Sequence, residues 1–548
     1  MNKHKKYIVI GALGLSSVFT FSFVDNYFEM SKNLDIFTTL YKEVNTYYVD
    51  DIEPSKFMRT GIDAMLESLD PYTNYISEAE TEDYRFQVTG QYGGIGATIG
   101  MRENEIMITE PYEGFPAQKE DLRPGDILLE IDGKSMKGKT TSDVSKLLKG
   151  QPKTKVKLRI KREGTGELVK EITREEIHVK NVPYFGMIND NIGYIKLTGF
   201  TNDAGKEVKD ALTELKKNDK LASVILDVRG NPGGLLHESV NVVNVFVSKG
   251  QEVVSTKGKA KEWDKSYHTL GQAVDAEIPL VVLTSRSSAS ASEIVSGTIQ
   301  DLDRGVIIGQ RTFGKGLVQS TRPLTYNSQL KVTTAKYYIP SGRCIQALDY
   351  SHRNEDGSVG SVPDSLKKEF KTKAGRKVYD GGGVNPDIET KAENMSAIAQ
   401  SLLYKQIIFD FATSYHSKHA TIVPARSFSI TEADFTEFIN FAKTRNYDYT
   451  TRAEQSLEDF RKKAEDEKYF EAVKETYEKM KQQLKRDKDA DILKNKAEIT
   501  ELLEEEIARR YYFQKARVES SFDDDAEIQE AVKLFSDMKK YQSLLKAN

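Results

Sequence analysis

Residues 288–319 contain three serines at alternate positions and, further along the chain, a lysine between two glycines. Ser288, Ser290 and Ser292 occupy alternate positions in SASAS, and Lys315 stands between two glycines in FGKG. No histidine occurs between residues 288 and 319. A neutral lysine amine can take the proton of a serine hydroxyl, and Ser-Lys pairs are a known variant of the Ser-His-Asp triad. These residue types therefore indicate acyl-transfer chemistry.

The serines follow a predicted buried strand and open a predicted helix. The run IPLVVLTS, residues 278–285, is apolar enough for a strand that is buried on both faces. The helix expected over 290–302 would direct its free N–H groups and positive dipole end at Ser290. An oxyanion formed there would be stabilised. The alternative is that these serines only cap the helix.

The lysine has apolar neighbours, which include Phe313, Leu317 and Val318. A lysine held among such side chains loses hydration, its pKa falls, and the amine becomes a competent base. The alternative is an ordinary surface lysine.

A third segment of interest, DVRGNPGGLL, follows another predicted buried strand, ASVILDV at residues 222–228. Its glycines allow main-chain N–H groups to approach a ligand closely. A second oxyanion donor could come from Gly233 or Gly234; the alternative is a tight strand-to-helix turn. The segment lacks the lysine and hydroxyl residue of a phosphate-binding P-loop.

Taken in order, DVRGNPGGLL, SASASEI, FGKGLVQ and YYIPSGRCIQ resemble the strongest blocks of the carboxy-terminal processing (tail-specific) proteases, peptidase family S41. The resemblance covers roughly residues 35–390. It implies that Ser290 is the nucleophile, Lys315 the general base and Gln319 the residue that orients the lysine. It also implies an oxyanion hole formed by the N–H of Ala291 and one glycine, Gly233 being preferred over Gly234.

The same resemblance implies an α/β + α fold, with a ClpP/crotonase-like β-α protease core and an inserted PDZ domain. YGGIGATI resembles the PDZ segment that holds a substrate's C-terminal carboxylate and pairs with it as an added strand. An apolar pocket lined by Ile95, Ile99 and Leu147 or Leu148 would select an apolar last residue, although core packing is the simpler expectation for each side chain. The predicted peptide-binding residues are Gly94, Ile95, Gly96, Ala97 and Ile99.

Changes in pattern along the chain predict its domain organisation. Helical spacing of apolar residues marks 26–80, and short strands with two helices mark 85–170. Alternating strands and helices follow over 180–390, and highly charged helical segments over 391–548. The predicted parts are a signal peptide or signal anchor at 1–25, an N-terminal helical region at 26–80, the PDZ domain at 85–170, the protease core at 180–390 and a charged helical region at 391–548.

Composition and charge limit the kinds of partner and cofactor that we expect. The net charge of −4 is too small to argue for nucleic-acid binding, and the single cysteine, Cys344, allows no intramolecular disulfide. We expect no metal and no cofactor. The basic MNKHKK followed by an uncharged run at 7–24 predicts export to a bacterial cell envelope (periplasm), with anchoring in the inner membrane if the run is retained. Membrane contact is expected through this segment alone.

The sequence thus predicts a serine endopeptidase that recognises exposed apolar C-termini of exported proteins and processes or degrades them. A homodimer or an adaptor surface could form through the helical regions. One alternative is a Ser-His enzyme that uses His237, which follows the glycine turn. The other is a catalytically inactive PDZ-containing envelope binding protein or chaperone, which intact Ser290, Lys315 and Gln319 disfavour.

Overall fold

The computed structural model describes residues 27–391, 395–445, 447, 449–484 and 488–547. The described residues form two compact units. One contains the chain up to Tyr75 together with Thr321–Val332, and the other contains Ile76–Ser320 and the chain from Thr333 onward. The predicted signal segment lies outside the described residues.

The N-terminal part of the first unit is helical up to Glu67, as predicted for this region. A helix spans residues 27–47, and α2 (Pro54–Glu67) follows with Pro54 at its first turn. Proline is favoured there because its missing N–H has no helical partner. Many apolar side chains of the first helix are exposed, such as Phe28, Leu34 and Phe37. Over the described part of the chain, no helix has the length and apolar character needed to span a bilayer.

The second unit begins with a small α+β module that matches the predicted strands and helices. Its elements are α3 (Thr81–Thr89), β2 (Gln91–Gly94), β3 (Ala97–Arg102), β4 (Glu105–Pro111), α4 (Pro116–Lys119), β5 (Ile127–Ile131), β6 (Lys134–Ser135), α5 (Thr141–Leu148), β7 (Lys155–Arg162), β8 (Gly166–Thr173) and β9 (Glu175–His178). The sheet has the order β3-β4-β5-β7-β8, so β3 is an edge strand. The Asp-Gly hairpin between β5 and β6 is confirmed.

The core of the second unit is a six-stranded sheet in the order β10-β11-β12-β15-β16-β23. Every neighbouring pair from β11 to β23 is parallel, and β10 is antiparallel. The predicted buried strands are confirmed, because every residue of β12, β15 and β16 is buried. The strands are β10 (Tyr184–Met187), β11 (Ile192–Lys196), β12 (Ser223–Asp227), β15 (Leu280–Thr284), β16 (Val306–Gly309) and β23 (Ile388–Glu389).

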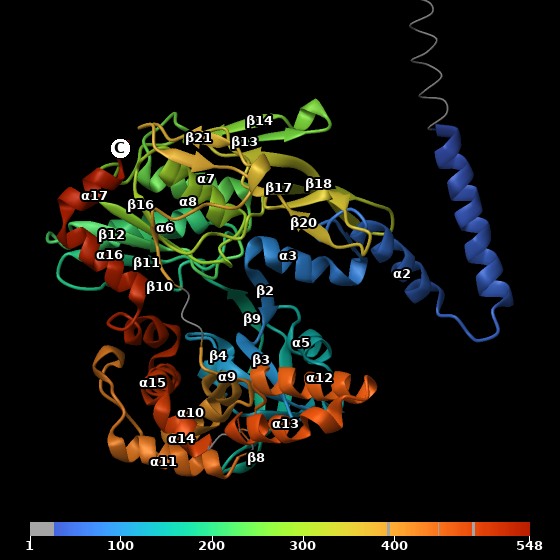
Figure 1. Cartoon of the computed structure of the whole chain (residues 1–548), viewed down its shortest axis with the longest axis vertical. Coiled ribbons are helices and arrows are strands. Elements are labelled where there is room, and N and C mark those ends of the chain that lie inside the picture. The colour runs from blue at the N-terminus through green and yellow to red at the C-terminus, as the bar shows by residue number, and fades with distance from the viewer. Residues whose placement is uncertain (1–26, 392–394, 446, 448, 485–487, 548) are drawn as a thin grey trace, which may run out of the picture. The chain divides into compact units, whose positions relative to one another are not determined.

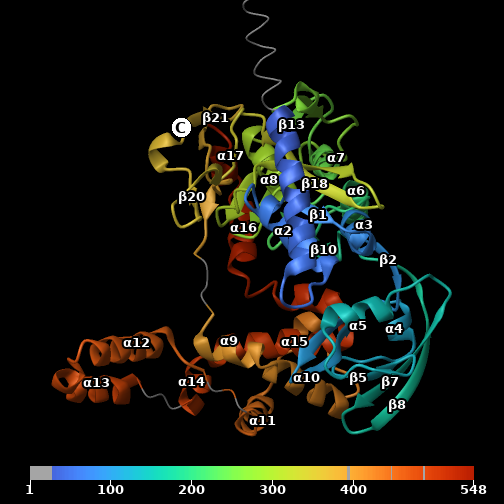
Figure 2. The same ribbon diagram turned by 90° about the vertical axis from the view of Figure 1, so that its right-hand side faces the viewer.

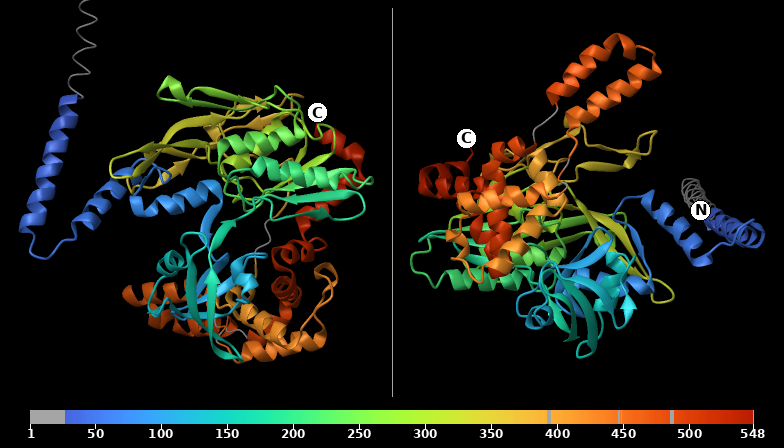
Figure 3. Two further views of the ribbon diagram at one scale, coloured as in Figure 1. Left: turned by 180° about the vertical axis from the view of Figure 1, so that it is seen from behind. Right: turned by 90° about the horizontal axis from the view of Figure 1, so that it is seen from below.

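Helices cover both faces of this sheet (Figure 1). On one face α6 (Ala204–Leu215), α7 (Leu236–Phe246) and α8 (Ala291–Asp301) pack on Leu226 and Val282. On the other face α16 (Ala526–Ser536) and α17 (Met538–Leu544) pack on Ile225 and Val281. Figure 3 shows these C-terminal helices beside the core from behind.

A second sheet carries the lysine segment. Its elements are β13 (Glu252–Gly258), β14 (Lys265–His268), β17 (Leu317–Pro323) and β18 (Gln329–Tyr338). The order is β18-β13-β14, and β17 pairs with β18. Lys315 lies two residues before Leu317, the first residue of β17. Two antiparallel two-stranded sheets complete the region before β23. They are formed by β19 (Leu348–Arg353) with β20 (Val359–Ser361) and by β21 (Glu369–Lys371) with β22 (Lys377–Tyr379).

Figure 2 shows the helices of the region that follows. This region has its own hydrophobic cluster. The predicted helix near residue 431 is confirmed as α11, which starts with a capping box between Thr431 and Asp434 and buries Phe435, Phe438 and Ala442. The mixed-charge segments form α12 and α13 with few buried residues, as expected for solvated helix faces. The helices are α9 (Ala397–Tyr404), α10 (Ile407–Lys418), α11 (Glu432–Lys443), α12 (Arg452–Asp466), α13 (Phe470–Leu484), α14 (Lys488–Lys494) and α15 (Lys496–Ser520).

Candidate active site

Ser290 lies at the turn between β15 and α8, at the carboxyl edge of the parallel sheet. Its backbone has φ 56° and ψ −113°, a conformation that is strained for a residue with a Cβ. Such strain is characteristic of a nucleophile elbow, in which a sharp strand-to-helix turn presents a serine. The residue is half-buried, and its carbonyl accepts a hydrogen bond from the hydroxyl of Tyr337 at 3.2 Å.

A buried carboxylate holds the main chain of both predicted dyad residues. Glu293 Oε2 accepts the main-chain N–H of Ser290 and of Lys315, each at 2.8 Å. Glu293 Oε1 accepts the N–H of Gly314 at 2.7 Å and the hydroxyl of Thr312 at 2.6 Å. One side chain of α8 therefore fixes the serine turn and the lysine loop to each other.

The pKa of Glu293 is raised from its ordinary value, because burial penalises the carboxylate more than the four hydrogen bonds favour it. The side chain is fully buried. Glu293 is not among the site residues predicted from the sequence. The available signal was the S-x-x-E spacing from Ser290 to Glu293, which is typical of a capping box at a helix start.

The glycine turn contacts the serine directly. A Cβ at Gly233 would lie 2.8 Å from Ser290 Cβ and 2.9 Å from the Ala291 nitrogen, and φ is +98°. Only glycine fits such an approach without displacing its neighbours. The turn is bonded to the serine segment through buried Asn231, whose carbonyl accepts the Ala289 N–H at 3.1 Å and the Ser292 hydroxyl at 2.9 Å.

Hydrogen bonding distinguishes the two glycines. The Gly233 N–H donates to Asn231 Oδ1 at 2.9 Å, so it is already engaged within the turn. Within the described chain, neither Gly234 nor Ala291 donates its N–H to another protein group. The N–H groups of Ala291, which follows Ser290, and of Gly234, which follows Gly233, therefore have no hydrogen-bond acceptor among the described protein groups.

Gln319 and His237 lie on two further elements. Gln319 is on β17, and its Nε2 donates to Thr333 Oγ1 at 3.1 Å. His237 is on α7 with a side chain that is 61% exposed, and its Nε2 lies 3.6 Å from Glu238 Oε1. Among the described residues no hydrogen bond joins His237 to Ser290. The geometry gives the Ser-His alternative no support.

The predicted peptide-binding segment spans the end of β2 and the start of β3. Ile95 is 2% exposed and belongs to the core of the module, so only its main chain can contact a ligand. Ile99 is partly buried against the same core. Gly96 has φ +74°, and a Cβ there would lie 2.5 Å from Phe115 Cβ. The open edge of β3 agrees with strand addition by a peptide.

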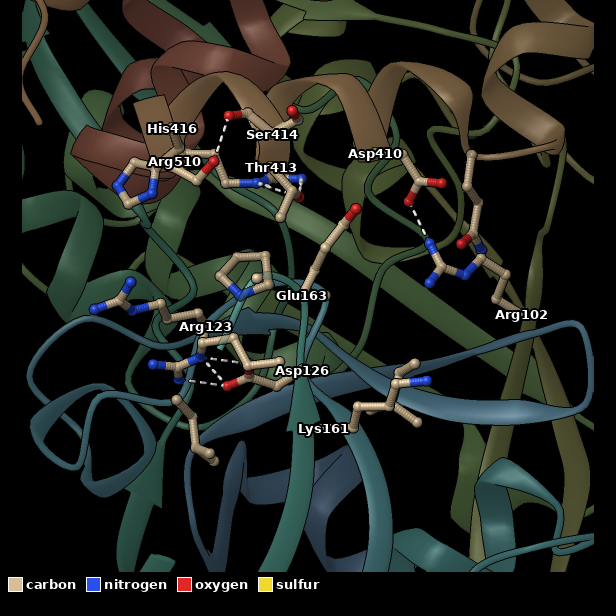
Figure 4. Close-up of a pocket in the computed structure, with 18 of the residues that line it drawn as sticks. Arg102, Arg123, Asp126, Lys161, Glu163, Asp410, Thr413, Ser414, His416 and Arg510 are labelled. Carbon is tan, nitrogen blue, oxygen red and sulfur yellow. Dashed lines mark hydrogen bonds and ion pairs between the residues drawn. The ribbon is translucent and has the colours of Figure 1, made fainter. Parts of the chain in front are cut away.

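A large cavity of about 1550 Å³ lies elsewhere, between this module and the helices α10 and α15 (Figure 4). Its charged side chains are largely paired, as in Arg102 with Asp410 and Arg162 with Asp126. Burial, together with Arg123 and Arg510, lowers the pKa of His416. Ser290 and Lys315 are not among its lining residues.

Three family models match separate parts of the chain. Residues 191–351 match peptidase family S41, 107–162 match a PDZ domain, and 398–535 match the C-terminal helical domain of probable PDZ-proteases. A carboxy-terminal-processing protease from Bartonella bacilliformis is 38% identical over 322 residues, which are 58% of this chain and 73% of that protein. The chain therefore belongs to the carboxy-terminal-processing proteases of peptidase family S41.

Relatives from Staphylococcus aureus are matched over a smaller share of their length. A probable CtpA-like serine protease of Staphylococcus aureus is 38% identical over 57% of this chain and 62% of its own length. Among solved structures, the photosystem II D1 C-terminal processing protease is 27% identical, covers 65% of this chain and 92% of its own, and superposes with a TM-score of 0.36.

Proposed function

We propose that this protein is a serine endopeptidase in which Ser290 is the nucleophile and Lys315 the general base. The observation that carries the proposal is the shared carboxylate of Glu293, which positions the strained serine turn and the lysine loop together. A nucleophile and its base must be held within hydrogen-bond reach, and fixing both main chains restricts that geometry.

The proposed reaction begins when the neutral amine of Lys315 takes the hydroxyl proton of Ser290. Ser290 Oγ attacks the scissile carbonyl carbon, and the N–H groups of Ala291 and Gly234 stabilise the oxyanion. The C–N bond then breaks, and the Lys315 ammonium returns its proton to the leaving amine. Water attacks the acyl-enzyme with Lys315 again as base, which releases the acid product and Ser290. Gln319 is proposed to orient Lys315.

The PDZ domain fits binding of peptide C-termini. We propose that it captures exported proteins with exposed apolar C-termini, with the main chain of Gly94, Gly96 and Ala97 around the carboxylate. The basic N-terminus and the uncharged run at 7–24 support an envelope location. This choice of substrate follows from the chemistry of a carboxylate nest beside an open strand edge.

The test compares the full chain with Ser290→Ala, Lys315→Ala and His237→Ala on an unfolded protein that has an apolar C-terminus. We expect the wild type and His237→Ala to cleave it and the other two to lose cleavage, with products identified by mass spectrometry. Because the amine must be neutral, cleavage should rise with pH between 5 and 9. Tail binding without cleavage by any form would favour a PDZ-based binding protein instead.

A further inference from the structure

The guanidinium of Arg229 joins the glycine turn to the start of α16. It lies 2.7 Å from Asp227 Oδ2, 2.8 Å from Asp525 Oδ2 and 2.8 Å from Glu527 Oε2. Arg229 is 17% exposed, and Asp525 and Glu527 are each 16% exposed. Asp227 ends β12, whereas the partners of Arg229 at the start of α16 follow almost 300 residues later.

These contacts have the geometry of strong charged hydrogen bonds. Arg229 donates to both oxygens of Asp227 and, through Nη1, to Asp525 and Glu527 at 2.8 Å each. Burial alone would lower the pKa of Arg229, but Asp227 and Asp525 raise it well above its usual range. The side chain therefore stays charged, and paired charges in such a site resist displacement.

Arg229 is also part of the turn that contacts Ser290. Its N–H donates to Asp227 Oδ1 at 2.8 Å, and the next residue, Gly230, donates to Ser285 Oγ at 3.1 Å. Asn231 then bonds to the serine segment and to the Gly233 N–H. A displacement of Arg229 would consequently move the glycines that face the serine.

We propose that Asp525 and Glu527 are positioning residues for the oxyanion site, which they hold in place through Arg229. This inference rests on the proposed function and extends it to the C-terminal helices. Neither carboxylate contacts the reacting atoms. Each adds a contact to the Arg229 guanidinium beyond those made by Asp227, so the turn has one favoured position before substrate arrives.

Conservative variants can remove the charges and keep the helix. Asp525 Oδ1 accepts the Ile528 N–H at 3.0 Å as the cap of α16, and asparagine can still accept it. Glu527 Oε1 accepts the Thr390 hydroxyl at 2.9 Å, which glutamine preserves. The helix remains anchored by Ile528, Ala531 and Leu534, which are all buried.

The experiment uses the full chain with Asp525→Asn and Glu527→Gln combined. Glu530→Gln is the matched control, since Glu530 is on the same helix and pairs with Lys533 and Lys540 at 3.8 and 3.7 Å instead. We expect kcat on a peptide substrate to fall about tenfold with KM within a factor of about two, as misplaced catalytic groups produce. We also expect faster amide hydrogen exchange in residues 229–234, with unchanged exchange in β12 and β15.

The inference would be overturned if amide hydrogen exchange in residues 229–234 were equally fast in the wild type, the double variant and Glu530→Gln. It would also be overturned if the double variant exchanged faster to the same extent throughout the sheet. Exchange is measured without substrate, so it decides the coupling even if the wild type cleaves nothing. If the wild-type protein does not cleave the peptide, the proposed function is overturned. An active wild type with an equally active double variant would overturn the positioning role alone.

Discussion

Glu293 and Lys315 are joined by a 2.8 Å hydrogen bond from the main-chain N–H of Lys315 to Glu293 Oε2, across 22 residues of sequence. The same oxygen accepts the N–H of Ser290. The side chains proposed for proton transfer are thus mounted on two loops that share one acceptor. A preorganised site needs such supports, because a misplacement of about 1 Å can cost about 10²-fold in rate.

Glu293→Gln should impair both stability and cleavage. The glutamine amide can accept only through its oxygen, and its NH₂ would face buried N–H donors. We expect a loss of about 2–4 kcal/mol in the free energy of unfolding and at least about 100-fold in kcat. Denaturant unfolding and peptide turnover measure the two effects. Glu214→Gln should change neither quantity, because Glu214 is an exposed residue of α6 that pairs with Lys217.

Gly233→Ala should reduce turnover more than substrate binding. The added Cβ would lie 2.7 Å from the Ala289 carbonyl oxygen and close to the nitrogen of Ala291, at a φ of +98°. The clash would move the serine turn, so we expect kcat to fall at least about 100-fold. Gly230→Ala is the comparison, since its Cβ would meet nothing within 4 Å although φ is also positive at +73°. Equal kcat values for the two variants would contradict the prediction.

Arg229→Gln should produce a pH-dependent loss of stability. Burial raises the pKa of Asp227, but Arg229 and Lys196 outweigh it and hold that pKa below the usual 3.8. In the wild type this group therefore stabilises the fold above pH 3.8, and the contribution is lost as pH falls through the lower folded value. Without Arg229 the pKa of Asp227 should rise, so its ionised form becomes unfavourable near neutral pH.

We therefore expect the deficit of Arg229→Gln relative to wild type to be about 3–5 kcal/mol at pH 7 and smaller near pH 4. Urea unfolding at both pH values measures it. A deficit of the same size at both values would mean that the loss comes from packing and not from the charge of Asp227.

The PDZ domain should distinguish a free C-terminus from a blocked one. A nest of main-chain N–H groups stabilises a carboxylate and gains much less from a neutral amide. We expect a peptide with an apolar last residue to bind the Ser290→Ala chain at least about tenfold more tightly than its C-terminal amide. Fluorescence anisotropy measures both, and equal affinities would contradict recognition of the terminal carboxylate.

The sequence predicted the strands and helices that present Ser290, because buried apolar runs and helix-start signals are local. The role of Glu293 was not apparent, since a glutamate in a first helical turn is ordinarily a solvent-exposed cap. Its partners Thr312 and Gly314 lie on a distant loop. The hydrogen bond that engages the Gly233 N–H also required the structure, because it depends on the position of the Asn231 side chain.

The predicted boundary after residue 390 placed α16 and α17 in a separate charged region, whereas they pack on the protease core. A signal for this was available. The strands near 225, 281 and 307 are apolar on both faces, which requires helices on both sides of the sheet. Helices between the strands account for one face only. The sequence could not show which later segment covers the other, because that pairing spans hundreds of residues.

The hydroxyl of Tyr541 accepts the N–H of Leu280 and donates to its carbonyl, across 261 residues. Synthesis proceeds from the N-terminus, so the serine and lysine segments emerge long before α17, which covers one face of the six-stranded sheet. Until residues 522–541 arrive, the face around Ile225 and Val281 stays open to water and to other chains. The proteolytic machinery would then mature late, and a ribosome stalled before this point would release an unfinished enzyme with an exposed apolar sheet.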